Sequence, residues 1–403
     1  MMTWIITLIV LLTYAGIAVG GIPGTRMNRA TIAVVGAVAL VAAGALTEDQ
    51  ALQSLDMGTI LLLGAMMVIN VNLRLAGFFR YVGSRTLRWA HRPATLLAVV
   101  IAASGLLSAL FLNDTICLML TPVVVDLTLR LGRNPVPYLI GLGVATNVGS
   151  VATITGNPQN IIIGQSSGIT YLTFLAYLAP VALIGLVICW LVIVIVYREE
   201  FRGELSLIEL PPAHPYPPLL TRTLLVVAGL LIAFLLGLPI VTSACAAAGI
   251  LLISRVRPAK LLALDWELLV MFTGLFVVTG AIEQSGLSDG LFDRFTDTLK
   301  SGIVPFTVAT SALSNVISNV PAVLLLRSEM AAFPDPQKAW LTLAMASTLA
   351  GNLTLLGSAA TLIVAELAQL RGVKLSFMAF LKVGVPVTIL TLIVGMVWLS
   401  IMP

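Results

Sequence analysis

Four short clusters of amide and hydroxyl side chains interrupt long apolar segments of this sequence. They are Asn113-Asp114-Thr115, Thr155-Gly156-Asn157-Pro158, Ser318-Asn319-Val320-Pro321 and Leu356-Gly357-Ser358. Amides, hydroxyls and the free backbone groups of an interrupted helix are what a small anion and a hard cation both need. Helix N-termini face negative charge, and unwound carbonyl groups coordinate Na⁺. The clusters therefore predict a binding site for a small solute and a cation.

The predicted substrate contacts come from all four clusters. They are Asn113, Thr115, Thr155, Gly156, Asn157, Ser318, Asn319, Gly357 and Ser358. This set contains no Lys or Arg. An anion bound there would depend on neutral donors, helix ends and a co-bound cation, whereas a neutral oxyacid would need only the donors.

Asp114 is the one carboxylate that the sequence places near the middle of a membrane. Charged groups are expensive there and usually mark an ion or proton pathway. We expect Asp114 to carry a proton or to bind the coupling cation, with Asn147 and Asn352 as further ion-coupling residues. A Na⁺ site would lie near Asn113, Asp114 and Gly156. The alternative is a structural cap at a hairpin tip, because Asp also caps helices.

Composition identifies the class of protein that must position these clusters. Of the 403 residues, 59% are hydrophobic and 10% are charged, whereas soluble proteins carry about 25% charged residues. The sequence predicts an all-α polytopic membrane protein whose surroundings are the lipid bilayer. The net charge of +4 indicates membrane orientation and no nucleic-acid partner. The sequence has no nucleotide-binding loop motif, no His or Cys spacing typical of a metal site, and no Ser/His/Asp set. We therefore expect that the protein is not an enzyme and has no cofactor.

Two kinds of apolar run do not fit a simple membrane span. The runs 138–164 and 339–366 carry polar breaks and predict broken helices. The run 302–326 would give about 12 residues to each arm of a hairpin, roughly 18 Å, which is too short to cross a core of about 30 Å twice. We therefore expect a re-entrant hairpin there and, by symmetry, another at 94–129. The longer run 94–129 has enough residues for two full spans, and that alternative stays open.

Basic residues predict the orientation of the spans. With both hairpins returning to their own side, 18 of the 22 Lys and Arg fall on the cytoplasmic side, as the positive-inside rule requires. Arg294, Lys300, Arg327 and Lys338 are left outside. The prediction is about ten transmembrane helices in the inner (cytoplasmic) membrane, with both termini outside.

The same count makes the two halves inverted repeats. The first, residues 1–204, contains three spans, the hairpin 94–129, the broken span 138–164 and a closing span at 171–196. A Pro-rich cytoplasmic linker, residues 205–219, leads to the second repeat, residues 220–403. Matched residues support the repeat: Leu55-Asp56 corresponds to Leu264-Asp265, and Gly77 to Gly286, both at an offset of 209.

Three motifs carry a resemblance that covers essentially the whole chain. They are ATNVGSVATITGNPQNIIIG (145–164), ISNVPAVLLL (317–326) and AGNLTLLGSAATLIVAE (350–366). These motifs resemble the ion transporter superfamily, which includes arsenical pump membrane proteins, divalent anion:Na⁺ symporters and a class of Na⁺/H⁺ antiporters. The resemblance implies a scaffold region, a transport region of hairpins and broken spans, and elevator-like alternating access, commonly in homodimers. The tips are nearest to the arsenical pump branch, and the first break is similar to general anion permeases.

The sequence thus predicts a secondary active transporter of a small inorganic oxyanion or its neutral acid, of the arsenite type, coupled to H⁺ or Na⁺. The alternatives within transport are a Na⁺-coupled dicarboxylate or citrate transporter and a Na⁺/H⁺ antiporter. A membrane enzyme and a channel are the alternatives from other classes. Inverted halves around broken helices favour a carrier over a channel.

Overall fold

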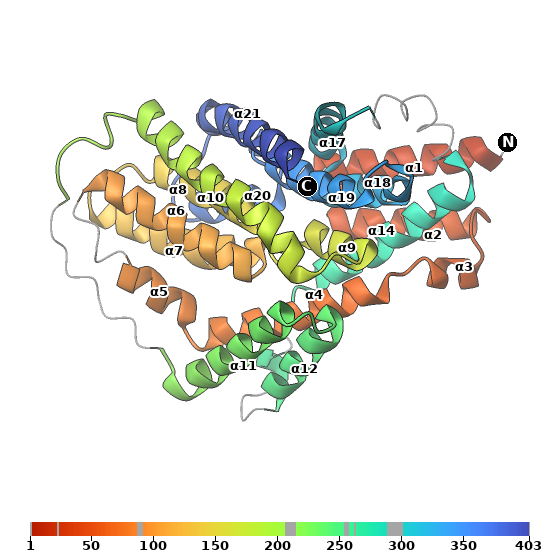
Figure 1. Ribbon diagram of the computed structural model, residues 1–403, viewed down its shortest axis with the longest axis horizontal. Helices are drawn as coiled ribbons and strands as arrows, with labels where there is room; N and C mark the ends of the chain where they lie inside the picture. Colours follow the sequence, from red (N-terminus) through yellow and green to blue (C-terminus); the bar gives the residue numbers. More distant parts are fainter. Residues whose placement is uncertain are drawn as a thin grey trace.

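The computed structural model describes residues 2–21, 24–86, 92–205, 215–253, 258–261, 263–287 and 301–402, which form helices and no strands (Figure 1). The first half contains α1 (Met2–Val19), α2 (Arg29–Ala42), α3 (Glu48–Gln53), α4 (Met57–Leu75), α5 (Phe78–Thr86), α6 (Pro93–Leu110), α7 (Asn113–Arg130), α8 (Pro135–Ser150), α9 (Pro158–Ser167) and α10 (Tyr171–Val196). The second half contains α11 (Pro217–Leu235), α12 (Ile240–Leu252), α13 (Pro258–Leu261), α14 (Trp266–Gln284), α17 (Ile303–Ile317), α18 (Asn319–Leu326), the 3₁₀ helix η2 (Arg327–Ala332), α19 (Pro336–Ala350), α20 (Ala359–Gln369) and α21 (Phe377–Ile401).

The predicted fold class, an all-α polytopic membrane protein, is confirmed. Within the described residues, α4, α6, α10, α11, α14 and α21 are each long and apolar enough to cross a membrane. The predicted broken spans are α8 with α9 and α19 with α20, and the predicted hairpins are α6 with α7 and α17 with α18.

The two hairpins differ in the length of their arms. Helices α17 and α18 have 15 and 8 residues, or about 22 and 12 Å, too little to cross the bilayer core. Helices α6 and α7 have 18 residues each, so length alone would allow two spans. The first tip nevertheless meets the first break, because the Asn113 N–H donates to the Gly156 carbonyl over 3.0 Å.

The breaks follow from local sequence. Helix α8 ends at Ser150, and a Cβ at Gly156 would collide with the Ser150 carbonyl, so only glycine permits this close approach. The chain becomes helical again where Asn157 caps α9 and Pro158 takes its first position, as its fixed φ favours. In the second half, α19 ends at Ala350 and Ser358 caps α20.

Equivalent hydrogen bonds occur in the two halves at the spacing that the sequence suggests. Asp56 accepts from the Thr59 N–H (3.0 Å) at the start of α4, and Asp265 accepts from the Leu268 N–H (3.1 Å) at the start of α14. These helices end before Gly77 and Gly286, whose positive φ values of 75° and 67° disfavour other residues.

The hairpins repeat a second contact. The Ser108 hydroxyl donates to the Thr146 carbonyl (2.6 Å), and the Ser314 hydroxyl donates to the Ser347 carbonyl (3.0 Å). Each bond ties the inner end of a hairpin arm to the helix before a break. Most of the predicted linker, residues 206–214, lies outside the described residues, and α11 already begins at Pro217.

Helices from the two halves pack side by side. Helix α2 packs against α14, α4 against α12, and α10 against α21. In Figure 1, α1, α2 and α14 lie together on the right, α6, α7 and α8 lie on the left, and α9 lies between the two groups. This interdigitation brings the tips and breaks of both halves together.

Candidate functional site

Four helix N-termini meet at one small cavity. The cavity has a volume of about 60 Å³, and its lining includes the first residues of α7 (Asn113, Asp114), α9 (Pro158, Gln159), α18 (Asn319, Val320) and α20 (Ala359 with its cap Ser358). The N–H groups in the first turn of a helix have no intrahelical acceptor, and the helix dipole adds positive potential there. The cavity is therefore suited to oxygen atoms of a small anion or oxyacid.

A larger cavity lies on the other side of Asp114. It has a volume of about 280 Å³, and Arg74 and Asp265 are among its lining residues. Asp114 and Pro158 line both cavities. Asp114 thus stands at the boundary between the larger and the small cavity.

Asn147 connects the first tip to the second break. Its Oδ1 accepts from Asn113 Nδ2 (3.2 Å), and its own Nδ2 donates to Asn352 Oδ1 and to Ser358 Oγ (2.9 Å each). All four side chains are buried. Hydrogen bonds at this depth are costly to lose, because a buried donor or acceptor would be left unpaired.

Thr348 makes the reciprocal connection. Its hydroxyl accepts from Asn157 Nδ2 (3.3 Å) and Gln159 Nε2 (3.1 Å). Thr348 stands 201 residues after Asn147, the same offset that relates the caps Asn157 and Ser358. Each half therefore sends one side chain to the helix cap of the other half, which fixes the two breaks relative to one another.

The structure brings part of the predicted substrate set to the small cavity. Asn113, Ser318, Asn319 and Ser358 line it. Thr115 instead lines the larger cavity, where its hydroxyl accepts from Asn70 Nδ2 (3.2 Å).

The remaining predicted contacts serve the breaks. Asn157 lines neither cavity, because its amide donates to Ser150 and Thr348 while its oxygen caps α9. Thr155, Gly156 and Gly357 also lie away from both linings. Thr155, Gly156 and Asn157 belong to the turn before α9, and Gly357 belongs to the turn before α20. These turns set the positions of the two helix N-termini at the cavity.

The predicted ion-coupling residues are divided in the same way. Asp114 faces the cavities, while Asn147 and Asn352 bond to one another. Asn113 Oδ1 is buried and has no hydrogen-bond partner among the described residues, so it is an oxygen that a cation beside Asp114 could use. The described residues contain no cluster of three His, Cys, Asp or Glu.

Arg29 was absent from the predicted set and yet lines the small cavity. The prediction that this site holds no Lys or Arg is therefore wrong. The sequence places Arg29 at the start of the second span, 84 residues before Asn113, and no local pattern links the two. Gln159 also lines the cavity, and it stands directly beside a predicted cluster.

Comparison with known proteins gives a consistent family. The family described as CitMHS, citrate transporter, matches residues 4–350 of this chain. The chain is 30% identical to the silicon efflux transporter LSI3 of Oryza sativa subsp. japonica, over 93% of each protein. It is 29% identical to the inner membrane protein YbiR of Escherichia coli strain K12, over 87% of this chain and 89% of that protein.

A solved structure shares the fold. The crystal structure of the Alcanivorax borkumensis YdaH transporter superposes with a TM-score of 0.58, covering 99% of this chain and 96% of that one, at 15% identity. At that identity the likeness concerns the fold alone. The family match extends over most of the chain. This protein therefore belongs to the CitMHS, or citrate transporter, family of secondary membrane transporters.

Proposed function

We propose that this protein transports a small oxyacid, neutral or singly charged, of the kind formed by trivalent arsenic or by silicon. The observation that carries the proposal is the meeting of four helix N-termini at one cavity of about 60 Å³. One water molecule needs about 10–15 Å³ of such a cavity, so this volume corresponds to only a few water molecules. A molecule of a few heavy atoms fits this space, and its oxygens would accept from the free N–H groups and amides.

The chemistry of one relative is consistent with this substrate class. The rice protein is named for silicon efflux, and silicon dissolves in neutral water as the uncharged acid Si(OH)₄. Trivalent arsenic forms the analogous neutral acid As(OH)₃. Both molecules present hydroxyl groups that can donate as well as accept, which matches a cavity lined by the Asn113 and Asn319 amides and the Asp114 carboxylate.

Coupling to H⁺ or Na⁺ is assigned to Asp114 in this proposal. Its carboxylate lies between the two cavities, and a buried negative charge favours either protonation or a bound cation. A Na⁺ ion there could also draw on Asn113 Oδ1 and on the carbonyls of the first break, including Gly156. Movement of the hairpins and broken spans against the scaffold, in an elevator-like step, completes the proposal.

Reconstituted protein tests the substrate class. Proteoliposomes would be loaded and assayed with arsenite, germanic acid as a silicic acid analogue, and citrate, each under a pH gradient, a Na⁺ gradient or neither. We expect gradient-driven accumulation of arsenite or germanic acid that protein-free liposomes do not show. Transport of neither oxyacid under any gradient would overturn the proposal.

Citrate is the second candidate, and the larger cavity favours it. At about 280 Å³ this cavity can hold a tricarboxylate, and Arg74 on its wall offers a cation. The family description also names citrate. Citrate uptake that depends on Na⁺ or H⁺ and is abolished by Arg74→Gln, without oxyacid transport, would establish this candidate instead.

A further inference from the structure

Arg29 is the only Lys or Arg among the described residues that line the small cavity. It is half-buried. The cavity is otherwise lined by amides, hydroxyls, apolar side chains and the Asp114 carboxylate. The positive charge of Arg29 adds to the positive potential of the four helix N-termini. Together they attract the oxygen atoms of a ligand more strongly than the helix ends do alone.

The start of α2 is fixed so that Arg29 reaches the cavity. Asn28 caps this helix by accepting from the Thr31 N–H (2.9 Å), and its amide donates to Glu267 Oε2 (2.8 Å) at the start of α14. Helix α14 itself contributes Leu268 to the lining. The Asn28–Glu267 bond thus holds the first residue of α2 beside the segment of α14 that faces the site.

No described carboxylate lies within ion-pair distance of the Arg29 guanidinium, and no described acceptor takes a hydrogen bond from it. Asp114 and Glu366 act on it only through longer-range electrostatics. A guanidinium has five N–H donors in a planar fork suited to a pair of oxygens. A half-buried Arg with these donors unused is arranged to receive an acceptor that the protein itself does not supply.

We propose that Arg29 is the substrate-binding cation of the small cavity, and that it selects ligands which present an oxygen acceptor to Arg29 and a hydroxyl donor to Asp114. This inference rests on the proposed oxyacid transport and identifies the residue that determines its specificity. A fully ionised anion can satisfy Arg29 but is repelled by the Asp114 carboxylate. A hydroxylated oxyacid satisfies both groups, because its oxygens accept from the guanidinium and a hydroxyl donates to the carboxylate.

The test measures binding of arsenite and germanic acid to purified full-length protein by calorimetry. Arg29→Gln should weaken binding of whichever oxyacid the wild type binds by about 10- to 150-fold, the range for losing one charged hydrogen bond. Arg29→Lys keeps the positive charge but lacks the planar guanidinium, so its affinity for the oxyacid should lie between those of the wild type and Arg29→Gln. Arg26→Gln is the matched control, because Arg26 is an exposed arginine three residues earlier that lines neither cavity, and it should bind as the wild type does.

The outcomes separate this inference from the proposed function. If the wild type binds an oxyacid and Arg29→Gln binds it equally well, the role of Arg29 is wrong while the transport proposal stands. If Arg26→Gln lost as much affinity as Arg29→Gln, the cause would be the loss of a positive charge anywhere near this helix end. That result would also overturn the inference. If the wild type binds neither oxyacid, both proposals fail together. Thermal unfolding of each variant, with Arg29→Lys as the conservative change, shows whether a loss reflects folding.

Discussion

At the scale of single residues, the site combines one cation, one carboxylate and several neutral groups. Asp114 and Arg29 line the same cavity without an ion pair between them. Asn113, Asn319 and Ser358 supply neutral donors and acceptors between these charges. Such a site can hold a ligand with little net charge.

The first residue-scale prediction concerns coupling. Asp114→Asn removes the carboxylate that would take up H⁺ or Na⁺ while keeping its shape. We expect oxyacid transport that no longer responds to either ion gradient, measured as flux into proteoliposomes. Asp126→Asn is the control on the same helix, since Asp126 is largely exposed and pairs with Arg371 over 3.5 Å. If oxyacid transport by Asp114→Asn still depended fully on the H⁺ or Na⁺ gradient, Asp114 would have only a structural role as a helix cap.

The second residue-scale prediction concerns backbone strain at the tip of the second hairpin. Ser318 has φ 82° and ψ 157°, a region that costs a non-glycine residue about 1–3 kcal/mol. Ser318→Gly should therefore raise the free energy of unfolding by about 1 kcal/mol, less than the full strain because glycine loses more entropy on folding. Thermal unfolding in detergent would measure it.

Ser376→Gly provides the comparison for this change. Ser376 caps α21 with φ −79° and accepts from the Ala379 N–H, so glycine relieves no strain there and removes a cap. Its stability should fall by a few tenths of a kcal/mol. If Ser318→Gly lowered stability as much as Ser376→Gly, the strained tip would contribute nothing measurable.

At the scale of elements, the breaks are held by contacts that cross between the halves. Asn147 reaches the cap of α20, and Thr348 reaches the cap of α9. The broken spans are thereby tied together, whereas α2 contributes Arg29 to the same cavity from the other group of helices. Helices of both groups therefore line the site.

The element-scale prediction tests this connection. Asn147→Ala removes three hydrogen bonds, which leaves Asn113 Nδ2 and Asn352 Oδ1 without a buried partner, whereas Ser358 keeps its bonds to Thr361. We expect a loss of at least about 1–3 kcal/mol of stability, the cost of one unsatisfied buried group. Asn134→Ala on the same helix loses only a local cap, worth about 1 kcal/mol. Equal thermal stability of the two variants would contradict the proposed tie.

The sequence indicates the elements better than the contacts between them. Short arms and Gly or Pro breaks are local properties, so the hairpin 302–326 and the break at Gly156-Asn157-Pro158 could be predicted. Whether Asn157 faces substrate or caps a helix depends on Ser150 and on Thr348, which is 191 residues away. Arg29 reaches the cavity only because α2 packs on α14, a long-range contact that no local pattern encodes.

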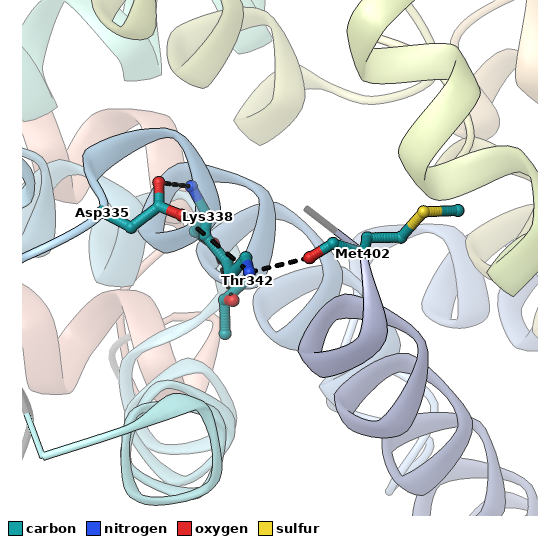
Figure 2. Close-up of polar contacts among 4 residues, drawn as sticks. All are labelled: Asp335, Lys338, Thr342 and Met402. Carbon is teal, nitrogen blue, oxygen red and sulfur yellow. Dashed lines mark hydrogen bonds and ion pairs between the residues drawn. The ribbon is translucent and has the colours of Figure 1, made fainter.

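At the scale of the whole molecule, one contact shows that the start of α19 lies beside the last turn of α21 and the residue that follows it. Figure 2 shows Lys338 beside the end of the chain, where its Nζ donates to the Met402 carbonyl over 2.9 Å. Asp335, at the start of α19, lies 4.0 Å from the same nitrogen. The start of α19 and Met402 therefore lie on the same side of the molecule, and the sequence predicts that this side faces outward.

The topology prediction follows from the distribution of basic residues. In a variant without Cys117, Cys189 and Cys245, a single cysteine at position 338 should react with an impermeant reagent added to intact cells. Cysteines at Arg198 or Lys260 should react only after the membrane is opened. External labelling at position 198 in intact cells would reverse the proposed orientation.

We propose that substrate binds between the two hairpin tips and the two breaks. A density map of the protein saturated with the transported oxyacid tests it most directly. We expect density in the small cavity, within hydrogen-bond distance of Asn113, Asn319 or Arg29. Density in the larger cavity beside Arg74, with the small cavity free of ligand, would contradict it.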